Sequence, residues 1–170
     1  MAAKSFMRLV AGKLAAIQAV VTSAGAGNDG DIVALDATGK LDPSVLPVGV
    51  GPDVTNMASF EDLSSGDYVN IFDDAGTIKA RKADNSNSRP AHGYITDTVT
   101  APAVVNVFFE GENANLSGLT LGARIYLGVT GGVTETALVP ITDTGKIHQY
   151  LGLAISATSV NTDIEDCVDL

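Results

Sequence analysis

The chain has 170 residues, which predicts one domain or one domain with an arm, and 45% of them are hydrophobic, enough to bury a core. Its net charge of −10 repels phosphate backbones, so nucleic acid is not expected as a partner. We expect neither a signal peptide nor a membrane span, because Lys13 and Gln18 interrupt the one fairly apolar run near the N-terminus. The single cysteine, Cys167, excludes an internal disulfide and fits synthesis in a reducing cytoplasm.

The charge is unevenly distributed along the chain. Residues 1–28 contain three basic residues and no acidic one, whereas residues 110–170 contain eight acidic residues and two basic ones. Such asymmetry predicts that the two ends of the chain contact different surfaces.

Residues 5–22 are predicted to form an amphipathic helix, within an N-terminal region of helix and linker that covers residues 1–28. Apolar residues recur there at spacings of three and four, which places them on one helical face. A helix this short is marginal alone in water, so its apolar face must pack on the chain's own β domain or on another protein. We favour the second alternative. The candidate partner-binding residues are Lys4, Phe6, Arg8, Leu9, Lys13, Leu14 and Ile17.

Residues 29–58 are predicted to form an extended arm rich in glycine and proline. Pro43, Pro47 and Pro52 are incompatible with a regular helix or a central strand, although residues 32–35 are compatible with one short strand. We expect the arm to be ordered against a partner surface.

Residues 59–170 are predicted to form a small all-β domain, either a β-barrel or a sandwich. Short runs with alternating polarity are separated by frequent turn signals, which is typical of these folds. Gly131-Gly132 is a hairpin signal. The expected strands are Tyr68–Phe72, Thr77–Ala83, His92–Val99, Val104–Glu110, Arg124–Val129, Val133–Val139, Ile147–Ser156 and Ile164–Leu170.

The sequence contains no recognisable catalytic or metal-binding motif. His92 and His148 each lie in an expected strand, and neither has a nucleophile motif or a second metal ligand at a suitable spacing. The acidic C-terminal residues 163–169 suit a solvated edge that discourages strand pairing better than a cation site, although the second alternative stays open. We therefore predict a protein that is not an enzyme and has no metal or cofactor.

Residues 30–47 and a second block of short segments within residues 82–154 resemble structural proteins of bacteriophage virions. Residues 30–47 resemble a connector that joins an N-terminal attachment region to the rest of the chain in such proteins. The second block resembles the small β domain of phage capsid-decoration (cement) and head-fibre proteins. It consists of Lys82–Asp84, Ala91–Tyr94, Gly118–Gly122, Ile125–Leu127, Gly131–Thr134 and His148–Ala154.

This resemblance implies a homotrimer without catalytic activity that decorates or stabilises the capsid exterior and is made in the host cytoplasm. Its partner would be the major capsid protein, and its N-terminal arm would lie across the shell. The alternative is a tail or fibre adhesin subunit that binds a host surface glycan. We favour decoration, because the nine Phe and Tyr residues lie mostly in strand-like apolar runs, whereas a glycan site usually presents exposed aromatic rings.

Overall fold

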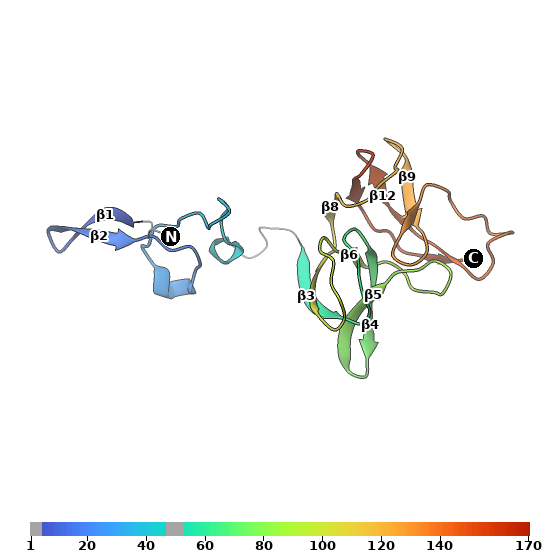
Figure 1. The fold of residues 1–170 in the computed structure, drawn as a ribbon, viewed down its shortest axis with the longest axis horizontal. Helices are drawn as coiled ribbons and strands as arrows, with labels where there is room; N and C mark the ends of the chain where they lie inside the picture. The colour runs from blue at the N-terminus through green and yellow to red at the C-terminus, as the bar shows by residue number, and fades with distance from the viewer. Residues whose placement is uncertain (1–4, 47–52) are drawn as a thin grey trace. The chain divides into compact units, whose positions relative to one another are not determined.

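The structure is a computed structural model that describes residues 5–46 and 53–170. The chain divides into two compact units, which we call the N-terminal unit (1–51) and the C-terminal unit (52–170) (Figure 1). The C-terminal unit begins before residue 59. Residues 54–59 form a strand of its barrel, although the sequence analysis placed residues 54–58 in the arm. Pro47 and Pro52 lie outside the described residues.

The predicted N-terminal helix is wrong: its residues form a β-hairpin. Strand β1 (Ser5–Val10) pairs antiparallel with β2 (Lys13–Gln18) in unbroken register. The two-residue turn between them has positive φ at both positions, 48° at Ala11 and 79° at Gly12. Positive φ at both central residues is the turn geometry whose twist matches that of the flanking strands. Gly12, which weakens a helix, is therefore favourable in the observed hairpin.

The remainder of the N-terminal unit is held by turns rather than by regular sheet. It contains two short 3-10 helices, η1 (Gly25–Asn28) and η2 (Pro43–Val45). Val20 forms an isolated parallel bridge with Val33. Residues 32–35, which the sequence analysis considered compatible with a short strand, therefore contribute one bridge and no regular strand. The Asp36 carboxylate accepts hydrogen bonds from the backbone N–H groups of Thr38 (2.7 Å) and Lys40 (2.9 Å), which closes a turn.

The C-terminal unit contains a closed barrel, one of the two all-β folds that the sequence predicts. Its strand order is β3-β5-β4-β6-β7, and β3 closes the ring by pairing parallel with β5 and antiparallel with β7. Closure leaves no unpaired sheet edge in the barrel. The strands are β3 (Val54–Ser59), β4 (Tyr68–Asp74), β5 (Thr77–Lys82), β6 (Gly93–Tyr94) and β7 (Val104–Phe108).

A five-stranded antiparallel sheet, with order β10-β9-β12-β13-β8, accompanies the barrel in the same unit. The hairpin expected around Gly131-Gly132 is present as β9 and β10. A smaller two-stranded sheet pairs β11 with β14 near the C-terminus. These strands are β8 (Gly111–Asn113), β9 (Arg124–Leu127), β10 (Val133–Thr134), β11 (Ile147–His148), β12 (Tyr150–Ala154), β13 (Val160–Thr162) and β14 (Val168–Asp169).

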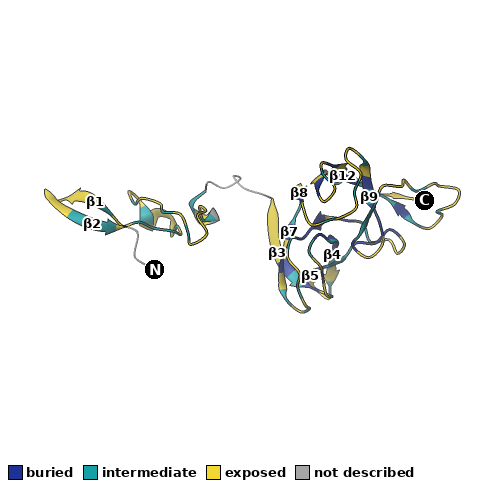
Figure 2. Ribbon diagram, turned by 45° about the horizontal axis from the view of Figure 1, so that its top comes forward, coloured by how far each residue is buried: buried dark blue, intermediate teal, exposed yellow. Residues whose placement is uncertain are grey.

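Two apolar clusters form the core of the C-terminal unit, where the dark-blue residues of Figure 2 gather. One contains barrel residues such as Val69, Ala80 and Val107. The other joins barrel and sheet, because Tyr68 of β4 packs in the same cluster as Leu151 of β12. The Tyr68 hydroxyl is also 3.0 Å from the Thr162 hydroxyl of β13, in a buried hydrogen bond. The barrel and the five-stranded sheet therefore share this second cluster.

Tyr68 makes the stability of the C-terminal unit sensitive to alkaline pH. Burial raises the pKa of this phenol to about 12, from an unfolded value near 10. Its contribution is complete below pH 10 and is lost as the pH rises to about 12, because only the neutral phenol fits the core. We expect a loss of about 3 kcal/mol of unfolding free energy from this residue over that window, from about 1.4 kcal/mol per pH unit.

Urea unfolding between pH 9 and pH 12 measures this loss. Tyr68→Phe should remove the Tyr68 part of the pH dependence, whereas Tyr150→Phe should retain it, because no hydrogen bond links the Tyr150 hydroxyl to another described residue. Equal pH profiles for the wild type and Tyr68→Phe would contradict the assignment.

Candidate partner-binding surface

The N-terminal unit has no buried residue among those whose burial the structure describes within 5–46, and no part of it is dark blue in Figure 2. Eight of its large apolar side chains are exposed, against eleven in the much longer C-terminal unit. Apolar surface left in water is a feature of interaction sites rather than of self-contained domains. The eight are Met7, Leu9, Val10, Leu14, Ile32, Val33, Leu35 and Leu41.

The hairpin has two different faces, because side chains alternate along each strand and paired residues share a side. One side, which we call the cationic face, carries Arg8 and Lys13 together with the half-buried pair Phe6 and Ile17. The opposite side, which we call the apolar face, carries Met7 and the directly paired Leu9 and Leu14. Their exposed fractions are 63%, 66% and 71%, so the apolar face has no cover within its own unit.

Arg8 fastens the cationic face to the rest of the N-terminal unit. Its Nη1 donates a hydrogen bond to the carbonyl oxygen of Gly30 at 3.2 Å. This bond connects the hairpin to the loop after η1, so part of the charge predicted for partner contact has a structural role. Lys13, next to the turn, is exposed.

The structure separates the residues that the helical pattern grouped together. Phe6 and Ile17 lie opposite each other on one face, whereas Leu9 and Leu14 lie on the other. Lys4 lies outside the described residues. Met7 was missed, because a period of 3.6 residues places it off the apolar stripe. An alternating pattern on both sides of Ala11-Gly12 is the signal that would have found it.

The two histidines accept hydrogen bonds from backbone N–H groups. His92 Nδ1 accepts from Ile71 at 2.9 Å, and burial holds the pKa of His92 below its usual value. His148 Nδ1 accepts from Leu138 at 3.3 Å. A ring nitrogen that accepts a hydrogen bond leaves the other ring nitrogen as the N–H donor in neutral imidazole. Both histidines therefore help to position backbone segments.

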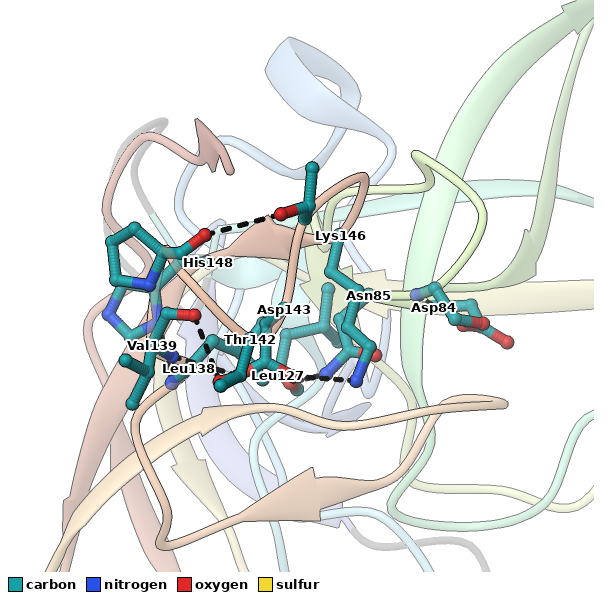
Figure 3. A network of polar contacts seen from close by, with 12 residues as sticks. Asp84, Asn85, Leu127, Leu138, Val139, Thr142, Asp143, Lys146 and His148 are labelled. Carbon is teal, nitrogen blue, oxygen red and sulfur yellow. Dashed lines mark hydrogen bonds and ion pairs between the residues drawn. The ribbon is translucent and has the colours of Figure 1, made fainter.

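A polar network fixes the long loop between β10 and β11 (Figure 3). Lys146 pairs with Asp143 at 2.8 Å, and the other oxygen of that carboxylate accepts the backbone N–H of Val139, also at 2.8 Å. Nearby, the buried Asn85 amide donates to the carbonyl oxygen of Leu127 at 2.7 Å. These side chains bond to one another and to the backbone, so their role is to stabilise the fold.

The remaining polar clusters show no assembled metal site. Within residues 5–46 and 53–170, no three His, Cys, Asp or Glu side chains are grouped so that they could hold a metal ion. In the acidic C-terminal segment, Glu165 donates its backbone N–H to Tyr150, and β14 pairs with β11. Cys167 is exposed.

No helix in the described part of the chain is long and apolar enough to cross a membrane. Comparison of the chain with models of protein families, with curated proteins and with solved structures finds no match. What the chain binds is therefore inferred from its own surfaces and from the sequence resemblance.

Proposed function

We propose that the chain is a structural virion protein that binds the outer surface of a phage capsid, and that its N-terminal unit makes the contact. The observation that carries the proposal is the N-terminal unit itself, with eight exposed large apolar side chains and no buried residue among those described. Such a unit gains its missing core from another surface. The resemblance of residues 30–47 to a virion connector supports a capsid as that surface.

The free energy of binding favours attachment through several N-terminal units at once. Each large side chain on the apolar face contributes about 1.5–3 kcal/mol if fully covered. Together, three of them contribute about 4.5–9 kcal/mol, which is similar to the cost of association of about 4–15 kcal/mol and leaves little net affinity for one chain. When three chains are linked in a homotrimer, binding of one N-terminal unit raises the effective concentration of the other two at the capsid surface. A homotrimer therefore attaches much more tightly than one chain. A trimer is therefore part of the proposal, and light scattering should give three times the 17.4 kDa chain mass, whereas the mass of one chain would contradict it.

The charge distribution gives the bound protein an orientation. The N-terminal unit contains four basic and four acidic residues, so the whole net charge of −10 lies in the C-terminal unit. Against an acidic shell, the C-terminal unit is repelled while the neutral N-terminal unit approaches. In this arrangement the barrel and its sheet project away from the capsid.

Substitutions on the apolar face test the proposal by co-sedimentation with undecorated capsids. Leu9→Ser combined with Leu14→Ser should weaken binding at least tenfold, because both side chains lose most of their apolar contact with the shell. The matched control is Leu121→Ser combined with Ile141→Ser. These two residues are 73% and 90% exposed in the C-terminal unit, and their replacement should leave binding unchanged.

Equal binding of both double variants would contradict the assignment of the hairpin. Failure of the wild type to bind capsids, together with binding to host cells, would instead support the alternative of a tail or fibre adhesin.

A further inference from the structure

Aromatic rings from strands β9, β12 and β11 lie next to one another in the C-terminal unit. Tyr126 of β9 and Tyr150 of β12 are direct partners in the register, and their ring centroids are 6.0 Å apart. The His148 ring lies 4.8 Å from Tyr126 at one end. The Arg124 guanidinium lies 4.8 Å from the centre of the Tyr150 ring at the other end. We call these four residues the aromatic row.

Strand alternation explains why the row faces outward. Ile125, Leu127 and Leu151 are at most 1% exposed and pack into the core shared with the barrel. Their neighbours Arg124, Tyr126 and Tyr150 therefore project from the opposite side of the sheet.

Three of the four residues of the row form no hydrogen bond or ion pair through their polar side-chain groups with any described residue. Neither tyrosine hydroxyl forms a hydrogen bond there, and Arg124 forms no ion pair. Since no buried side-chain nitrogen or oxygen of the described residues lacks a partner, both hydroxyls are accessible to solvent. His148 accepts through Nδ1, which leaves its Nε2–H as a donor.

A purely structural role accounts for only part of this arrangement. Cross-strand aromatic pairs stabilise a sheet, and an arginine stacked on a ring adds a cation–π contact. Phenylalanines would provide the same stacking as Tyr126 and Tyr150. Stacking does not explain two hydroxyls without a protein partner, a free N–H and a guanidinium without an ion pair in neighbouring side chains.

We propose that the aromatic row is a binding site for an acidic saccharide. The rings offer apolar area with polar ends, which suits the C–H face and the hydroxyl groups of a sugar ring. Arg124 pairs with the sugar carboxylate through charge-assisted hydrogen bonds. The C-terminal unit carries the whole net charge of −10, which repels an acidic ligand, so Arg124 has to supply the attraction locally. This site is additional to capsid attachment and does not depend on it.

A second cation–aromatic contact, on the barrel, supplies a matched control. The Arg81 guanidinium lies 4.0 Å from the centre of the Phe72 ring, but its Nε is already bonded to Asn70 at 2.9 Å. Phe72 and its neighbour Phe60 have no hydroxyl groups. Arg81→Gln therefore removes the same charge and the same type of contact without touching the proposed site.

The test applies the full-length protein to an array of neutral glycans and glycans that end in uronic or sialic acid. The wild type should bind the acid-terminated glycans and not the neutral ones. Arg124→Gln should weaken that binding at least tenfold and Tyr150→Phe about threefold, whereas Arg81→Gln should bind like the wild type. All variants should stay folded, with one cooperative melting transition, and co-sediment normally with capsids.

Five results would overturn the site. The first four are no binding to any acid-terminated glycan, equal binding to neutral glycans, unchanged binding of Arg124→Gln, and an equal loss in Arg81→Gln. Binding of poly-glutamate with the same affinity as the acidic glycans would also overturn it, because the site would then recognise carboxylates on a peptide rather than a sugar.

Discussion

Removal of residues 1–51 is expected to abolish capsid binding while the C-terminal unit stays folded. The two apolar clusters that stabilise the C-terminal unit contain no residue from the N-terminal unit. The truncated protein should therefore be soluble, rich in β structure and close to the full chain in its cooperative melting temperature. Co-sedimentation with undecorated capsids should fall to background.

Two other outcomes of this truncation have clear meanings. Unfolding of the truncated protein would show that the N-terminal unit completes the core of the C-terminal unit. Capsid binding of unchanged affinity would show that the barrel or its sheet is the docking surface, and either result contradicts our account.

Gly152→Ala is expected to destabilise the C-terminal unit by about 2–6 kcal/mol. Gly152 has φ of 148°, a conformation that costs other residues about 1–3 kcal/mol. A Cβ at this position would also overlap the backbone carbonyl oxygen of Asn161 on the neighbouring strand β13. Such overpacking adds about 1–3 kcal/mol. The glycine is thus required by the close approach of two strands next to the register shift between Tyr150 and Gly152.

Urea unfolding of Gly118→Ala provides the control for Gly152→Ala. Gly118 also has positive φ, 73°, but a Cβ there would meet no atom within 4 Å. Its replacement should cost only the conformational part, about 1–2 kcal/mol. Equal losses in the two variants would show that the contact with Asn161 has no effect.

Patterns within a short stretch of sequence predicted the β elements well. The hairpin of β4 and β5 follows from alternation on both sides of a glycine-containing turn, and the hairpin of β9 and β10 follows from Gly131-Gly132. Strands β3, β8 and β13 were missed. Residues 54–58 were assigned to the extended arm, and β3 is defined by its pairing with β5 and β7. Strands β8 and β13 have three residues each, too few for a period to be recognised.

The N-terminal hairpin shows how one apolar pattern can fit two structures. Phe6 and Leu9 on one side of Gly12, with Leu14 and Ile17 on the other, have spacings that match a helical face. In the hairpin the same residues form the direct pairs Phe6 with Ile17 and Leu9 with Leu14, on opposite faces. The turn residues Ala11 and Gly12 decide between the two, because positive φ at both is incompatible with a right-handed helix.

The aromatic row was not predictable from the sequence. Tyr126 and Tyr150 lie far apart along the chain, and the pairing of β9 with β12 brings them together. That pairing includes a register shift, and a shift of one residue changes which side chains share a face. Only the register of the folded sheet places Arg124 and both tyrosines on one surface.

Hydrogen–deuterium exchange on the full chain, free and bound to capsids, tests the central claim most directly. A two-stranded hairpin is marginally stable alone, so the amides of β1 and β2 should exchange rapidly in the free protein. On capsids they should become strongly protected, because the apolar face is then covered, while the amides of β3–β14 should keep their free-state rates. Protection confined to the C-terminal unit, with β1 and β2 unchanged, would contradict the account.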